Sequence, residues 1–92
     1  MPQIFKIGAY VVYFWANEGV PLEPIHVHVA QSTPSENATK IWITKHGRCL
    51  LSHNNSKIHP KILKNIVEII EARCNDVIDK WISFFNEINY YC

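Results

Sequence analysis

The sequence predicts one α+β domain, in which an antiparallel sheet of four to five strands is followed by two C-terminal helices packed on one face of the sheet. The chain has 92 residues, which is the size of a single domain, so the domain is expected to span residues 1–92. From about residue 4 to 52, short segments rich in β-branched and aromatic residues alternate with loops. From about residue 60 to 90, apolar residues recur every three or four positions, as they do in a helix. Strands that come before helices, instead of alternating with them, are typical of α+β domains.

The expected strands begin with an N-terminal hairpin. Gly8-Ala9 suits a two-residue type II′ turn, because glycine adopts the positive φ that its first position requires. The stretch 17–24 contains a glycine and two prolines, so it is expected to be a loop. The predicted strands form a meander over residues 4–7, 10–16, 25–30, 38–44 and a short segment around 48–51.

The helical period begins after Asn54-Asn55. Pro60 suits the first position of the first helix, because proline loses no hydrogen bond there, and His59 is then the N-cap, for which histidine is a poor choice. Asn75 is expected to cap the second helix. The two apolar stripes are Ile62, Leu63, Ile66, Ile69 and Ile70, and then Val77, Trp81, Phe84, Phe85 and Ile88.

Composition excludes several classes of protein. Apolar residues at 48% and charged residues at 18% indicate a folded chain, and a net charge of +1 gives no global field for a polyanion or a membrane. No apolar run reaches the ~18 residues that cross a bilayer, and no signal-peptide pattern opens the chain. Three cysteines without a CxxC pair indicate neither a disulfide framework nor a zinc knuckle. We therefore expect a cytoplasmic protein with reduced thiols and no membrane partner.

The first candidate site is the segment Pro24-Ile25-His26-Val27-His28-Val29. Because side chains alternate along a strand, His26 and His28 share one face, about 6.6 Å apart. The pair can bind a metal ion, with Glu23 or Glu18 as a third ligand. It can also act as acid and base on a phosphodiester. The third interpretation is that both imidazoles are polar residues on a solvated strand face.

The second candidate site is a basic window that contains no acidic residue. Its cations are Arg48, Lys57, Lys61 and Lys64. Lysines near a helix N-terminus oppose the helix dipole, which indicates an anionic partner such as RNA or DNA. The alternative is a solvated charged loop, whose positive charge is balanced by the acidic residues in the final third of the chain.

The second helix is a poor candidate for reading a DNA groove, because its exposed positions Asp76, Asp79 and Glu87 outnumber Lys80. Its aromatic stripe is more typical of a core. Any part of the stripe that faces outward would mark a surface for a cognate partner protein or a homodimer formed through the C-terminal helices.

Three segments carry a resemblance to a known family: the opening 2–8, the aromatic strand Tyr13-Phe14-Trp15 with Asn17-Glu18, and the histidine segment 24–29. Together with the closing 81–85, they resemble the small prokaryotic proteins of the domain of unknown function 4160 family. The resemblance covers nearly the whole chain. It implies a partner in a small two-gene toxin–antitoxin-like module, and the label of transcriptional regulator, but no established activity.

The expected function is therefore that of a binding component in a toxin–antitoxin-like or regulatory module, acting on nucleic acid or on a partner protein. The alternative is a small ribonuclease or a metal-dependent phosphoryl-transfer enzyme that uses His26 and His28. Nothing in the sequence names a cofactor.

Overall fold

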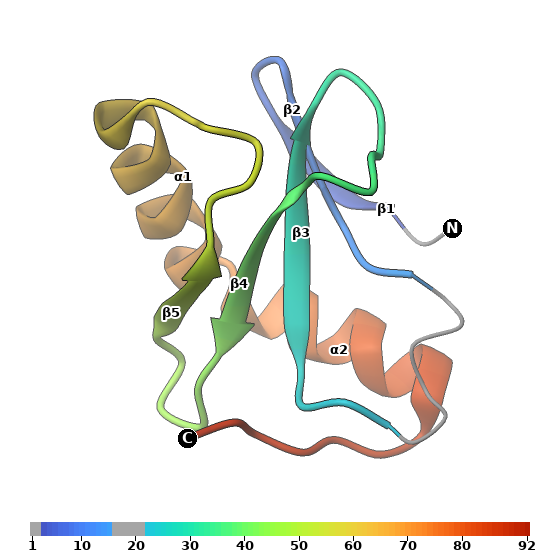
Figure 1. Ribbon diagram of the computed structural model, residues 1–92. Coiled ribbons are helices and arrows are strands. Elements are labelled where there is room, and N and C mark those ends of the chain that lie inside the picture. Colours follow the sequence, from blue (N-terminus) through green and yellow to red (C-terminus); the bar gives the residue numbers. More distant parts are fainter. Residues whose placement is uncertain (1–2, 16–21) are drawn as a thin grey trace.

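The computed structural model describes residues 3–15 and 22–92, and its strands form an antiparallel sheet in the order β1-β2-β3-β4-β5 (Figure 1). Two helices follow and pack on one face of the sheet. The predicted α+β class, the meander and the two C-terminal helices are thus confirmed. The elements are β1 (Gln3–Ile7), β2 (Tyr10–Tyr13), β3 (His26–Gln31), β4 (Thr39–Ile43), β5 (Cys49–His53), α1 (Pro60–Ala72) and α2 (Cys74–Phe85).

The turn between β1 and β2 forms at Gly8, whose φ of +58° is the positive value that such a turn requires. β2 ends at Tyr13, earlier than the predicted 10–16, and residue 16 lies outside the described residues. Phe14 leaves the ladder, but its side chain is fully buried against aromatic rings of α2. Packing against the helix has therefore replaced strand pairing at this position. Most of the expected loop 17–24 also lies outside the described residues.

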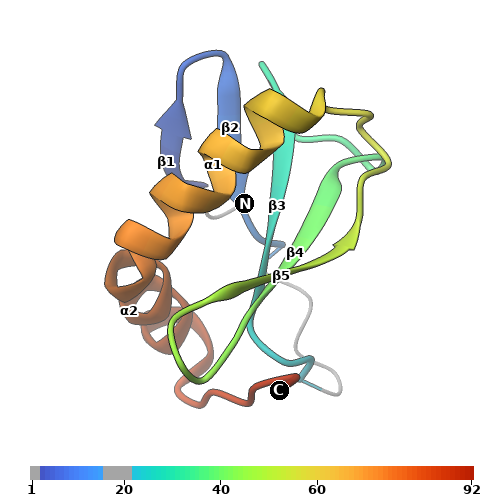
Figure 2. The same cartoon turned by 90° about the vertical axis from the view of Figure 1, so that its left-hand side faces the viewer.

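The main core lies between the sheet and the helices, where the apolar stripes of α1 and α2 meet the inner side chains of β2, β3 and β4. Figure 2 shows α1 crossing the sheet on this side. A smaller cluster, made of Val11, Tyr13, Ala30 and Ala38, with Trp15 beside it, lies apart from the main core. The core residues contributed by the helices are Ile66, Ile70, Val77 and Trp81.

The helix ends show how the chain turns between elements. His59 is the N-cap of α1, as predicted, and its Nδ1 accepts a hydrogen bond from the backbone N–H of Lys61 at 3.1 Å. The prediction that Asn75 caps α2 is wrong, because α2 begins at Cys74 and its N-cap is Arg73. Arg73 alone separates the helices. Its guanidinium lies 4.1 Å from the Phe5 ring centroid and its Nε donates to Asp76 Oδ2 at 3.0 Å. The break between the helices therefore lies at Arg73.

The segment after α2 runs along the end of the sheet (Figure 1). The backbone N–H of Ile25 donates to the carbonyl of Asn89 at 2.8 Å, and that of Lys45 donates to the carbonyl of Cys92 at 3.1 Å. Within residues 3–15 and 22–92, neither helix has the length and apolar character that crossing a bilayer requires.

Candidate functional site

The predicted histidine pair lies on the sheet face that the helices leave uncovered. The strand register pairs His26 with Trp42 and pairs His28 with both Tyr13 and Lys40. Paired residues in an antiparallel sheet point to the same side, so these side chains share one face. The shared face of His26 and His28, which alternation predicted, is therefore where the chain assembles its polar and aromatic groups.

The two imidazoles are in contact but differ in exposure. Their ring centroids lie 5.0 Å apart with an interplanar angle of 84°. His28 is half-buried, with Tyr13 at 5.5 Å and Trp15 at 6.5 Å between ring centroids. His26 is fully buried, with 0% of its surface exposed. Of the pair, only His28 can therefore touch a molecule that approaches this face.

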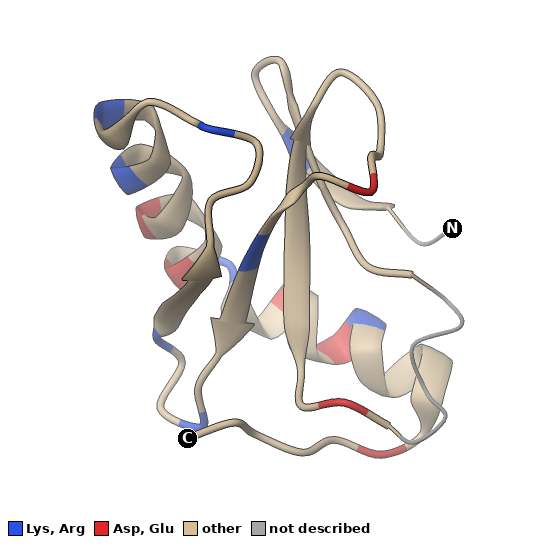
Figure 3. Cartoon of the chain, in the orientation of Figure 1, with Lys and Arg blue, Asp and Glu red and all other residues tan. Residues whose placement is uncertain are grey.

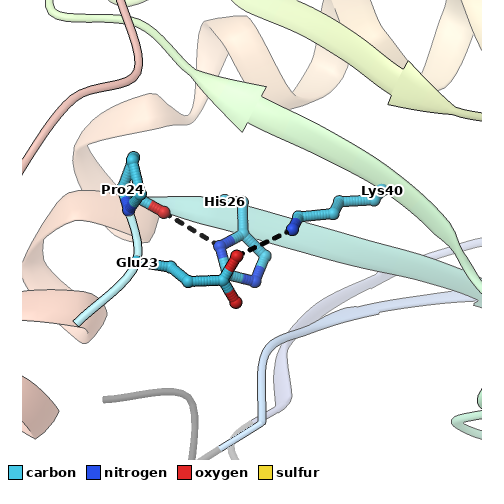
Figure 4. Close-up of polar contacts among 4 residues, drawn as sticks. All are labelled: Glu23, Pro24, His26 and Lys40. Atoms are coloured by element: carbon cyan, nitrogen blue, oxygen red, sulfur yellow. Dashed lines mark hydrogen bonds and ion pairs between the residues drawn. The ribbon is translucent and has the colours of Figure 1, made fainter. Parts of the chain in front are cut away.

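His26 is held by contacts from both layers of the protein. Its Nδ1 lies 2.9 Å from the carbonyl oxygen of Pro24 (Figure 4). Because a carbonyl only accepts, Nδ1 carries the proton and donates it. The ring also packs edge-on against Trp42 at 5.6 Å and against Trp81 of α2 at 5.4 Å between centroids. His26 is thus built into the core, where it can orient His28.

Glu23 makes an ion pair with Lys40, with 3.0 Å between Oε1 and Nζ (Figure 4). The Lys40 side chain is 17% exposed, and its ammonium also lies 4.3 Å from the Trp42 ring centroid. Across residues 3–15 and 22–92, no group of three or more His, Cys, Asp or Glu is placed to hold a metal ion. The structure therefore does not bring Glu23 together with His26 and His28 as a ligand set, and Glu18 lies outside the described residues.

Sequence reasoning missed the aromatic stack beside the histidines. The rings of Trp42 and Tyr91 lie parallel, with 4.8 Å between centroids and an interplanar angle of 7°. Trp42 is half-buried on β4, and Tyr91 belongs to the segment after α2. The two residues lie far apart in the chain, so no local pattern indicates the contact.

The basic window is divided by the fold. Arg48 lies near the end of α1, where its Nη1 is 3.8 Å from Glu71 Oε1. Lys57, Lys61 and Lys64 gather instead at the other end, in the loop before α1 and in its first turns (Figure 3). All three are exposed, and in the described part of the chain none forms an ion pair within 4.0 Å. The first turn of α1 contains no acidic residue. What remains of the window is therefore a lysine cluster, made of three exposed cations that form no ion pair within 4.0 Å in the described residues.

The loop that carries Lys57 is fixed by side-chain hydrogen bonds. Asn54 Oδ1 accepts from Thr39 Oγ1 at 2.7 Å and from the backbone N–H of Ile58 at 3.0 Å, while its Nδ2 donates to the Ile58 carbonyl at 2.9 Å. Ser56 Oγ accepts from the buried Thr39 N–H at 3.1 Å. These bonds hold Lys57 at a φ of +55°, a conformation that a lysine rarely adopts. One end of the lysine cluster is therefore anchored to β4.

The outer surface of α1 has a shallow hollow beside the lysines. Its lining side chains are Lys61, Ile62, Lys64, Asn65 and Glu68. Glu68 is its one acid, at the far end from the loop. The hollow is thus positive toward the N-terminal end of α1.

Cys49 is not a nucleophile in this fold. Burial, followed by the negative charge of Glu71 and by Cys74, raises the pKa of the Cys49 thiol from 9.0 to about 12. The backbone N–H of Cys49 donates to Glu71 Oε2 at 2.9 Å, which holds that carboxylate close by. The thiol therefore stays protonated at neutral pH.

The aromatic stripe of α2 belongs mainly to the core. Val77 and Trp81 are fully buried and Phe85 is half-buried. Phe84 remains 47% exposed and Ile82 41% exposed. A partner protein or a homodimer formed through this face stays a prediction.

Comparison with known proteins adds one relationship. No curated protein and no solved structure matches the chain. A family model described as a domain of unknown function (DUF4160) matches residues 9–82, a span that includes all of the sheet except β1, all of α1 and most of α2. The chain therefore belongs to the DUF4160 family of domains of unknown function, as the histidine segment and the aromatic strand indicated.

Proposed function

We propose that this protein binds nucleic acid through the sugar–phosphate backbone, as the binding component of a regulatory or toxin–antitoxin-like module. The observation that carries the proposal is the lysine cluster of Lys57, Lys61 and Lys64, which faces solvent without an ion-pair partner in the described part of the chain. Three like charges at the positive end of a helix dipole are unfavourable by themselves, and phosphates would relieve the repulsion.

The size of the cluster sets the expected strength of binding. Neutralising three phosphates of duplex DNA gives a slope of about −2.7 in a plot of log K against log salt concentration, and about −2 for a single strand. Non-specific binding to nucleic acid typically has a Kd of about 10⁻⁴–10⁻⁶ M at physiological salt, and we expect this protein to bind in that range. The protein would then discriminate poorly among sequences.

The test is fluorescence anisotropy of labelled RNA and DNA over a series of salt concentrations. The double variant Lys61→Glu, Lys64→Glu should lose at least tenfold in affinity and flatten the salt slope. The matched control is Lys45→Glu, Lys80→Glu, which makes the same change of net charge at two exposed lysines outside the cluster. If the affinity does not depend on salt concentration, or if both double variants lose the same affinity, the lysine cluster is not the contact surface.

Phosphodiester cleavage is a second candidate, favoured by the position of His28. The imidazole is half-buried on the uncovered face, in ring contact with His26, and its register partner on β4 is the cation Lys40. In this proposal His28 takes the proton of the attacking 2′-hydroxyl as its oxygen bonds to phosphorus and the P–O5′ bond breaks, and the leaving oxygen takes its proton from solvent. His26 acts as a positioning residue. His28→Ala should abolish cleavage of single-stranded RNA and leave the salt-dependent binding of duplex DNA unchanged, whereas cleavage that persists removes His28 from the chemistry.

A further inference from the structure

The stack of Tyr91 on Trp42 is the feature that neither the lysine cluster nor the histidine pair explains. The other ring pairs within residues 3–15 and 22–92 are inclined by 33° or more. This pair alone among them is parallel, at 7°. A parallel stack on an indole is also how proteins hold a nucleobase.

The side chain of Tyr91 makes few contacts with the rest of the protein. Its side chain stays 58% exposed even though one ring face is covered. The segment that carries it lies outside any helix or strand, and its backbone is tied to the sheet through the carbonyls of Asn89 and Cys92. The ring can therefore leave Trp42 while the core stays folded.

The surroundings of Trp42 suit a nucleotide. The Lys40 ammonium lies over the indole ring, 4.3 Å from its centroid, and brings a positive charge to the platform. Glu23 holds that ammonium at 3.0 Å with a side chain that is 43% exposed, so a phosphate can compete for it. His28 pairs with Lys40 across the strands and adds a further hydrogen-bonding group on this face.

We propose that Trp42 is a stacking platform for a nucleobase of single-stranded nucleic acid, and that Tyr91 occupies this platform as a displaceable strap. The inference rests on the proposed function and narrows its ligand from nucleic acid in general to exposed bases. Duplex DNA offers no free base face, so the platform contributes nothing to duplex binding.

Because a base can stack on Trp42 only when Tyr91 has left it, the observed affinity is the intrinsic affinity multiplied by the fraction of molecules in which the platform is open. An aromatic stack of this kind holds the closed form over the open form by a factor of about three to ten. Tyr91→Ala should therefore tighten the binding of an oligoadenylate by about threefold to tenfold and leave duplex binding unchanged. Tyr91→Phe is the matched control, since it keeps the stack and should behave like the wild type.

A second measurement uses AMP, which needs no lysine cluster. In Tyr91→Ala, AMP should shift the indole N–H signal of Trp42 in a two-dimensional NMR titration at lower concentration than in the wild type. The assignment of that signal comes from Trp42→Phe, with circular dichroism to check that the variant folds.

The outcomes separate this inference from the proposed function. If AMP shifts the Trp42 signal but oligonucleotide binding does not depend on salt, the result supports the platform and excludes the lysine cluster as a binding surface. Salt-dependent binding with no Trp42 shift in either protein overturns the platform. Weaker oligoadenylate binding in Tyr91→Ala overturns the strap, because Tyr91 would then belong to the binding surface itself.

Discussion

The imidazole of His26 lies edge-on to the indole of Trp81, with 5.4 Å between ring centroids and 65° between their planes. β2 ends at Tyr13, the register partner of His28. His26 is two residues from His28 along β3, so it lies beyond the end of the pairing with β2. Trp81, which belongs to the helix layer, can reach it there. A histidine of the uncovered face is in this way part of the core that joins the sheet to α2.

This contact predicts that the two histidines differ in their effect on stability. His26→Ala removes a fully buried ring and the hydrogen bond to Pro24, so it should lower the free energy of unfolding by about 2–4 kcal/mol. His28→Ala removes a half-buried ring and should cost about 1 kcal/mol. Urea denaturation followed by tryptophan fluorescence measures both. Equal costs would mean that His26 is not part of the core.

Replacing Asn54, in the loop before α1, should lower both the stability of the protein and its affinity for nucleic acid. Asn54→Ala loses three hydrogen bonds and leaves the backbone N–H of Ile58 without its acceptor, so we expect a loss of about 1–3 kcal/mol. Because the same bonds position Lys57, nucleic-acid affinity should fall as well. Asn55→Ala, at an exposed position of the same loop, is the control and should change neither quantity. If Asn54→Ala is destabilised but binds nucleic acid as tightly as the wild type, the position that these bonds give to Lys57 does not matter for binding.

Local patterns in the sequence were sufficient for most of the fold. Gly8 marks the first hairpin, and alternation puts His26 and His28 on one face. The three-to-four spacing identifies the helical core residues Ile66, Ile70, Val77 and Trp81, although Ile62 and Phe84 of the same stripes stay exposed. Each of these features depends on neighbours within one turn or one strand, which is the range over which a periodicity carries information.

The features that could not be predicted depend on contacts between distant parts of the chain. Arg48 is in the basic window by sequence, yet folding brings it to Glu71 at the opposite end of α1 from the lysines. The burial of His26 needs Trp81, and the stack on Trp42 needs Tyr91. Asn75 has a good capping side chain, but the break between the helices lies at Arg73, whose guanidinium packs on the distant ring of Phe5. Tertiary packing decides such positions over local propensity.

Gly47 should tolerate substitution less well than Gly8. Both have positive φ, +77° and +58°, so alanine costs about 1 kcal/mol at either position. At Gly47 an added Cβ would also lie 3.3 Å from the sulfur of Cys74, whereas at Gly8 it meets nothing within 4 Å. Thermal unfolding of Gly47→Ala should therefore show the larger drop in Tm. If the two variants have the same Tm, Cys74 yields without cost and the β4–β5 turn is looser than the structure indicates.

The Cys49 thiol should be slow to react and should make stability depend on pH in the alkaline range. Its pKa of about 12 leaves about one molecule in 10,000 as thiolate at pH 8, so iodoacetamide should label the exposed Cys92 first. In the unfolded chain the same thiol has a pKa near 9.0. Between pH 9 and 12 the unfolded state therefore gives up a proton that the folded state keeps, and the free energy of unfolding falls as pH rises through this window.

Tyrosine and lysine side chains also titrate in that range, so the Cys49 contribution has to be isolated by comparison. Cys49→Ala removes the thiol and should show a shallower fall in stability between pH 9 and 12 than the wild type. Glu71→Gln removes the second cause of the raised pKa, so Cys49 should become easier to alkylate, although burial, the larger cause, still protects it. Mass spectrometry of the labelled sites reads the order of reaction. Early labelling of Cys49 in the native protein would show that the carboxylate and the surrounding packing do not enclose the thiol as the structure places them.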